Sequence, residues 1–151
     1  MVAAPSMLRE RNAVMRLVTG GLVGLMLMAG AVQAAADAKA PLRDVREIDD
    51  NMLWAGIALR ISEECGEIDA RTLKGLNFLW SIKKKANALG YSDDEINAYR
   101  KSDAEKARIE ARGKAYVKSK GFDPGDAGDL CELGHAEIAR NSVIGTLLKA
   151  K

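Results

Sequence analysis

Histidine and cysteine, two side chains that often carry out catalysis, are scarce in this chain of 151 residues. It has one histidine, His135, and two cysteines, Cys65 and Cys131. No glycine-rich phosphate loop, no CxxC or CxxCH pair and no GxSxG elbow occurs. The motifs for binding a nucleotide, attaching haem or presenting a nucleophilic serine are therefore absent. We expect no catalytic residue, no cofactor and no metal site, and we predict that the protein is not an enzyme.

Aromatic side chains are also scarce, at 5% of the residues, whereas apolar residues make up 48%. A core built from such residues must be aliphatic and rich in alanine. Long β-branched runs are rare, while residues that favour helix, such as Ala, Leu, Lys, Glu and Arg, are abundant. The length and composition therefore indicate one domain with an all-α fold.

Residues 17–32 carry no charged side chain and follow a basic segment that holds Arg9, Arg11 and Arg16. This run is shorter than the roughly 20 residues of a membrane-spanning helix, and Ala34 to Ala36 follow it. Such a pattern is typical of a cleavable secretory signal peptide. We predict a signal peptide over residues 1–36, cleaved after Ala34 or Ala36, a flexible lead-in over 37–43 and a helical domain over 44–151, located in the periplasm. The alternative is an uncleaved N-terminal anchor, against which the length of the run and its exit both argue.

The exported part has no net charge. Residues 1–36 contain three of the 23 basic residues and one of the 21 acidic residues, which leaves 20 of each sign. A neutral protein has no overall field that attracts nucleic acid or an anionic surface. We therefore expect no nucleic-acid partner.

Cys65 and Cys131 both lie in the exported part. Thiols oxidise outside the cytoplasm, so an even count in a small exported domain indicates a disulfide. By loop-closure entropy, a bridge over this separation contributes about 4 kcal/mol. Free or metal-bound thiols are the alternative. If the bridge forms, Cys131 is not a nucleophile, and His135, one helical turn further along, has no thiol to activate.

The apolar spacing predicts a bundle of four or five helices, with no strand-like alternation anywhere. A capping box of Asp44 and Glu47 is expected to start a helix that ends near residue 65. A second helix is predicted from about 69 to 90. Ser92 with Glu95, and Ser102 with Glu105, form two further capping boxes, which predict a short helix, a break near 102 and a charged, solvated helix to about 120.

The last predicted helix covers the apolar residues from 130 to 148, after a turn at 121–128. Gly134, Ser142 and Gly145 lie near the Cys131 face, where small residues would let the first helix approach closely. The aspartates of "DPGDAGD" do not have the spacing of a calcium loop, so a turn explains them better.

Leu73, Trp80 and Lys84 are the only residues we single out for binding. Leu73 and Trp80 lie away from the main apolar stripe of the second helix, and partner surfaces commonly use such an aromatic anchor. Packing of this second face inside the bundle is the favoured interpretation, and a protein-binding surface is the alternative. The run of Lys83 to Lys85 suits the C-terminal end of the helix dipole.

Three segments resemble a known family: "NMLWAGIALRISEEC", "LNFLWSIKKKANALGYS" and "DLCELGHAEIARNSVIGTLL". They are similar to an uncharacterised family of small exported alphaproteobacterial proteins with a domain of unknown function. Members are encoded near the genes of the respiratory NADH–quinone oxidoreductase, and the resemblance thus implies an accessory role at that complex. The resemblance implies no site residue.

The expected function is therefore that of a non-enzymatic accessory or interaction protein in the periplasm, with a protein partner that this respiratory membrane complex could supply. No transmembrane helix is expected once the leader is removed. The alternative is a free periplasmic chaperone or stress-response protein, because small helical acid chaperones with one disulfide share this build.

Overall fold

The computed structural model describes residues 39–151, so the predicted signal peptide and its cleavage site lie outside the described residues. This part contains six α-helices, a 3-10 turn and a two-stranded sheet. The elements follow in the order η1 (Leu42–Asp44), α1 (Arg46–Glu64), β1 (Ile68–Ala70), α2 (Thr72–Ala88), α3 (Asp93–Lys101), α4 (Asp103–Ser119), α5 (Ala127–Ala139), α6 (Val143–Thr146) and β2 (Leu148–Ala150). The prediction of a helical fold is confirmed in outline, but the fold is not purely helical.

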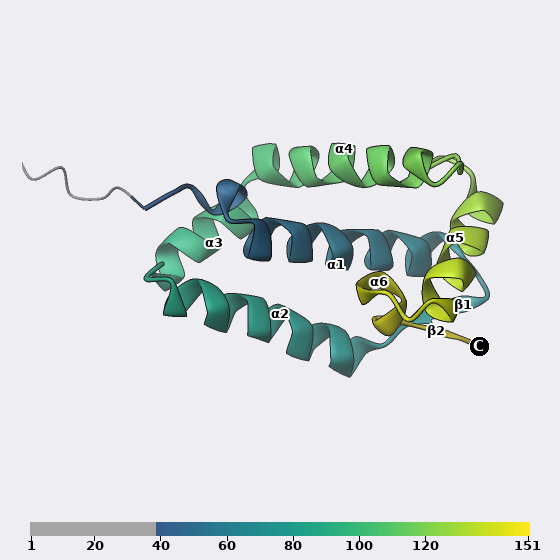
Figure 1. Ribbon diagram of the computed structural model, residues 1–151, viewed down its shortest axis with the longest axis horizontal. Helices are drawn as coiled ribbons and strands as arrows, with labels where there is room; N and C mark the ends of the chain where they lie inside the picture. The colour runs from purple at the N-terminus through teal and green to yellow at the C-terminus, as the bar shows by residue number, and fades with distance from the viewer. Residues whose placement is uncertain (1–38) are drawn as a thin grey trace, which may run out of the picture. The chain divides into compact units, whose positions relative to one another are not determined.

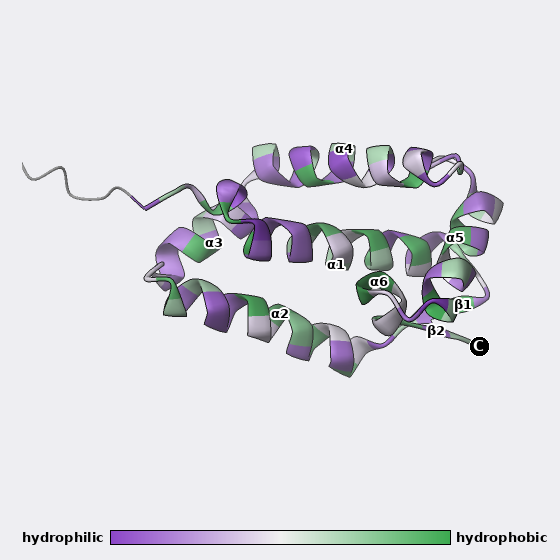
Figure 2. Cartoon of the chain, viewed as in Figure 1, coloured by the Kyte–Doolittle hydropathy of each residue, from purple (hydrophilic) through white to green (hydrophobic). Residues whose placement is uncertain are grey.

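Helix α1 is the centre of the domain and lies between α2 and α4 (Figure 1). Its N-terminal end is hydrophilic and its middle turns are mostly hydrophobic (Figure 2). Leu53, Ile57 and Ile61 recur at steps of four along one side and are buried. They pack with Leu130 and Leu148, among others, in the larger of two apolar clusters. The smaller cluster joins the start of α1 to the C-terminal half of α2, through Leu42, Ile48, Ile82, Ala86 and Tyr91.

A short antiparallel sheet replaces the predicted start of the second helix. Ile68 of β1 pairs with Ala150 of β2, and Ala70 pairs with Leu148. The Ile68 and Leu148 side chains are both fully buried, so the pairing fixes the C-terminal end of the chain onto the core. Each strand has three residues, which is too short to show an alternating pattern in the sequence.

The helix boundaries between residues 92 and 119 agree with the prediction. Ser92 and Glu95 form the complete capping box of α3, and Ser102 accepts a hydrogen bond from the backbone N–H of Glu105 at the start of α4. The predicted box at Asp44 is wrong, because Asp44 ends the 3-10 turn and α1 begins at Arg46 without a side-chain cap.

The predicted last helix is two helices and a strand. Asn141 has a positive φ of 50°, and Ser142 caps the new helix α6 by accepting from the backbone N–H of Gly145. The turn lets α6 fold back against α5, and a Cβ at Gly145 would lie 2.0 Å from the carbonyl oxygen of Glu137. Gly134 admits both β1 and the first helix: a Cβ there would lie 2.5 Å from Cδ1 of Ile68 and 2.7 Å from Cγ2 of Ile61. The prediction is therefore confirmed for Gly134, whereas Gly145 faces α5 and not the first helix.

Candidate functional site

An apolar groove of about 850 Å³ lies between α1, α2 and α4. The residues that line it are mostly small or aliphatic and include Ala55, Gly56 and Leu59 of α1, Gly75, Leu76 and Leu79 of α2, and Ile109 and Gly113 of α4. Residues 52–63 of α1 run along it, a length of about 17 Å at 1.5 Å per residue. The groove is therefore as long as three turns of helix.

The groove is open because the C-terminal half of α2 packs closely against the bundle, whereas the N-terminal half contacts the core mainly through the partly buried Phe78. Ile82 and Ala86 are buried there, whereas Leu76 and Leu79 in the N-terminal half are 51% and 41% exposed. In Figure 1, α2 diverges from α1 toward this N-terminal half. On the opposite side of the groove, Leu59 of α1 is 54% exposed. Three leucines thus present apolar surface around one opening, which is unusual for an aliphatic domain with a small core.

The charged residues along the groove are mainly cations. Five cations and two carboxylates line it. Three of the cations form ion pairs with carboxylates one turn away: Arg60, Lys106 and Lys114. Arg71, just before α2, and Arg100, in the last turn of α3, make no ion pair with any residue of 39–151. The groove therefore combines an apolar surface with unneutralised positive charge.

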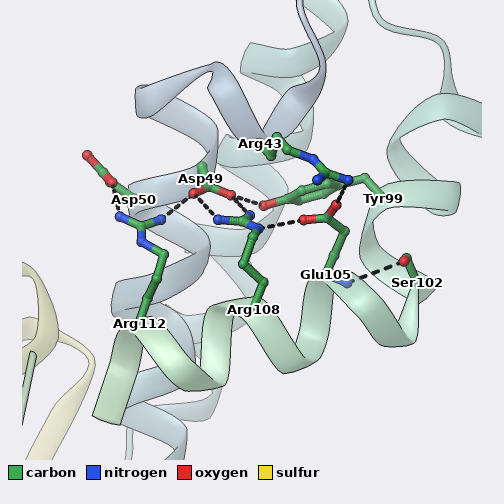
Figure 3. Close-up of polar contacts among 8 residues, drawn as sticks. All are labelled: Arg43, Asp49, Asp50, Tyr99, Ser102, Glu105, Arg108 and Arg112. Carbon is green, nitrogen blue, oxygen red and sulfur yellow. Dashed lines mark hydrogen bonds and ion pairs between the residues drawn. The ribbon is translucent and has the colours of Figure 1, made fainter. Parts of the chain in front are cut away.

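Asp49 on α1 fixes the α4 side of the groove through a buried ion network (Figure 3). Its carboxylate is 3% exposed. It accepts hydrogen bonds from the hydroxyl of Tyr99 at 2.5 Å and from the guanidinium of Arg108 at 3.0 Å, and a further one from Arg112. One carboxylate thus joins α1 to both α3 and α4.

The network continues to both sides of Asp49. Arg112 also donates to Asp50 at 2.7 Å, and Arg108 donates to Glu105 at 2.8 Å. Arg43 of the 3-10 turn forms an ion pair with the same Glu105. Burial raises the pKa of Asp49, but the hydrogen bonds from Arg108 and Tyr99 outweigh it and hold that pKa below its ordinary value. Asp49 is therefore an anion at neutral pH that holds three helices together.

Glu137 of α5 is a second buried carboxylate, with no exposed surface. It accepts from the hydroxyl of Tyr116 at 2.6 Å and from Nε of Arg140 at 2.9 Å, and it also accepts from Ser142. Burial raises its pKa, and these bonds outweigh burial and lower it. In residues 39–151, no buried side-chain nitrogen or oxygen lacks a hydrogen-bond partner. Both networks are thus satisfied internally, which suits a structural role better than a catalytic one.

The predicted disulfide is present and joins the end of α1 to α5, with Cys65 and Cys131 Cα atoms 5.1 Å apart. His135 is exposed, and its Nε2 lies 3.4 Å from a carboxylate oxygen of Glu67 on the surface. The described chain contains no group of three or more His, Cys, Asp or Glu side chains placed to hold a metal ion. The "DPGDAGD" segment is a turn over residues 123–126, Asp126 caps α5, and the last three residues of the segment begin that helix.

Leu73 and Trp80 do not pack inside the bundle, so that favoured interpretation is wrong. They are 79% and 68% exposed. Lys84 is exposed on the same helix. None of the three residues lines the groove, because they lie on the side of α2 that faces away from α1. The second helix therefore has exposed apolar side chains at the groove, Leu76 and Leu79, and others on its outer side, Leu73 and Trp80.

Sequence reasoning missed Asp49, although its position gives a signal. Asp49 precedes Leu53, Ile57 and Ile61 by steps of four, so it heads the buried stripe of α1. A carboxylate at such a position needs cations on the helix that covers it. Arg108 and Arg112, one turn apart on α4, supply them.

Comparison with known proteins gives one match. A family model described as a family of unknown function, DUF5333, matches residues 40–149. The chain belongs to this family. The match includes the groove, both buried networks and both cysteines, so the family is defined over the whole folded domain. No curated protein and no solved structure matches the chain.

Proposed function

We propose that this member of DUF5333 is a non-enzymatic, exported accessory protein that binds a helical segment of a partner protein in the groove between α1, α2 and α4. The observation that carries the proposal is the exposure of Leu59, Leu76 and Leu79 around one elongated apolar opening. Amphipathic helices bind in such grooves through apolar side chains spaced three and four residues apart. A groove three turns long suits one short helix.

The charge of the groove indicates which kind of helix would bind there. Arg71 and Arg100 have no anionic partner in the described chain and line the same groove. A bound helix with carboxylates flanking its apolar face would neutralise them, which steers association and sets orientation. Gly75 of α2 lines the groove as well, and nothing lies within 4 Å of the position that a Cβ would take there, which leaves room for a helix backbone to come close.

Export is part of the proposal. The Cys65–Cys131 disulfide supports an oxidising compartment, because such bridges form and persist outside the reducing cytoplasm. No helix within residues 39–151 has the length and hydrophobicity to cross a bilayer. The partner we propose is the respiratory NADH–quinone oxidoreductase at its periplasmic side, which rests on the family resemblance rather than on any contact described above.

Affinity isolation of the tagged protein from native membranes, followed by mass spectrometry, tests this function. We expect the wild-type protein to capture subunits of the complex and Leu59→Glu with Leu76→Glu to lose them. Val143→Glu is the matched control, because Val143 of α6 is 42% exposed and does not line the groove. Equal capture by both variants would exclude the groove, and absence of the complex from the wild-type sample would exclude the partner.

The exposed leucines also favour the second candidate, a free periplasmic chaperone. An acid-activated chaperone must loosen as the pH falls and expose more apolar surface. The lowered pKa values of Asp49 and Glu137 work against this, because the networks they hold stay ionised in mild acid. Increased binding of an apolar dye at about pH 5, with loss of near-ultraviolet circular dichroism, would favour the chaperone over the accessory protein.

A further inference from the structure

The side of α2 that faces away from the groove carries an exposed apolar row. Leu73 and Trp80 are seven residues, or two helical turns, apart, which places them along one side of the helix. Their side chains are 79% and 68% exposed. Leu73 and Trp80 lie outside the groove, so a helix bound there would leave them uncovered.

Cations surround this row and carboxylates are absent from it. Residues 70–92 contain five lysines and arginines and no Asp or Glu. Two of these lysines are neutralised by other elements: Lys83 pairs with Asp93 and Lys85 pairs with Glu47, each at 2.9 Å. The other three cations, Arg71, Lys74 and Lys84, make no ion pair with any residue from 39 onward. The positive charge of α2 is therefore available to an external anion.

We infer that the outer face of α2, formed by Leu73, Lys74, Trp80 and Lys84, binds the surface of a bilayer that contains anionic phospholipids. Tryptophan and leucine enter the boundary between headgroups and acyl chains, and tryptophan is enriched there. Lysine stems lie along the apolar surface while their ammonium groups reach the headgroup phosphates. The chain attaches through one helix lying on the membrane.

A bilayer fits this face better than an acidic protein does. A protein partner gains most from aromatic side chains that insert into pockets and are shielded from water at the centre of an interface. Trp80 and Leu73 instead project from a single helix whose opposite side is the groove. The absence of net charge in the exported part does not oppose the inference, because attraction to a surface falls off within about 8 Å and depends on the nearest charges.

Sedimentation with vesicles tests the inference on the protein as it is isolated from cells. We expect binding to vesicles of one part phosphatidylglycerol to three parts phosphatidylcholine, and weak binding to phosphatidylcholine alone. Each cation near an anionic surface is worth about fivefold in affinity, so Lys74→Gln with Lys84→Gln should weaken binding by roughly thirtyfold. Leu73→Ser with Trp80→Ser should abolish the binding that persists in high salt.

Two controls isolate the outer face of α2. Lys101→Gln with Lys118→Gln removes the same charge from α3 and α4, at exposed lysines that form no ion pair within the described part, and it should bind as the wild type does. Brominated acyl chains should quench the fluorescence of the wild type and leave that of Trp80→Phe, which keeps Trp54, unchanged.

Failure of the wild type to bind anionic vesicles would overturn the inference, as would equal weakening by the two lysine pairs. Capture of an acidic protein that depends on Lys74 and Lys84, without vesicle binding, would assign the outer face to a protein instead. None of these results bears on the groove, whose variants are tested by capture of the membrane complex.

Discussion

Among conservative substitutions of the charged residues of α1, Asp49→Asn should lower the unfolding free energy of the domain the most. The substitution keeps the size of the side chain but replaces an anion, 3% exposed, with a neutral amide. In the variant, the amide NH₂ of Asn would face the guanidinium groups of Arg108 and Arg112, which donate to the carboxylate in the wild type. Donors would then face donors. The hydroxyl of Tyr99 would lose its charged acceptor as well.

The loss of unfolding free energy depends on how many ion pairs of the network remain in the variant. Removing one partner of a buried ion pair costs about 3–5 kcal/mol. The two arginine side chains are 29% and 35% exposed, and each keeps a second carboxylate, Glu105 for Arg108 and Asp50 for Arg112. Partial rehydration and these remaining pairs place the loss at the lower end, about 3 kcal/mol. At about 4 °C per kcal/mol, the melting temperature should fall by about 12 °C.

Asp50→Asn is the matched control on the same helix. Asp50 is 29% exposed and accepts from Arg112 alone among the network arginines, so its loss should cost under about 1 kcal/mol. Urea and thermal unfolding followed by far-ultraviolet circular dichroism measure both variants. If the two substitutions change the unfolding free energy equally, Asp49 does not hold α1, α3 and α4 together, and our account of the network is wrong.

Three further predictions concern the rest of the domain. Replacing Cys65 and Cys131 by serine should lower the unfolding free energy by about 4 kcal/mol, and reductant should lower the melting temperature of the wild type alone. Gly145→Ala should prevent α6 from packing against α5, because the new Cβ would lie 2.0 Å from the backbone oxygen of Glu137. Gly75→Ala has nothing within 4 Å of its Cβ and should stabilise α2 by about 0.5–1 kcal/mol. The pKa of Asp49 is lowered in the fold. The contribution of Asp49 to the unfolding free energy is therefore present above the ordinary carboxyl pKa of about 4 and is lost as the pH falls through the folded value. Urea titrations at stepped pH should show that the unfolding free energy falls more steeply below about pH 4 in the wild type than in Asp49→Asn.

Local patterns were sufficient for the features that depend on a few neighbouring residues. The Ser92 capping box, the break at Ser102 and the pairing of the two cysteines were all predicted from spacing or count, and the structure contains them. Each of these features has a signal that lies within four residues or follows from there being only two cysteines.

The features that were missed depend on tertiary contacts. The strand at Ile68–Ala70 forms only because the C-terminal residues 148–150 return to pair with it. The break between α5 and α6 needs a positive φ at Asn141 and close contact of Gly145 with Glu137. The apolar periodicity favours one continuous helix there, because apolar residues recur across the break at helical spacing.

Net charge was the least informative quantity for the candidate sites, since a sum does not describe how charges are distributed. Asp93, Asp94 and Glu95 lie together in the first turn of α3, while residues 70–92 carry only cations. Asp49 and Glu137 are buried against partly exposed arginine partners, so these carboxylates contribute little at the surface. The zero total of residues 37–151 therefore combines acids buried in the core or placed on other elements with cations left at the surface of α2. It excludes a global field without excluding a local one. A neutral domain can bind an anionic surface when its carboxylates are buried or lie on other elements and its cations gather on one face.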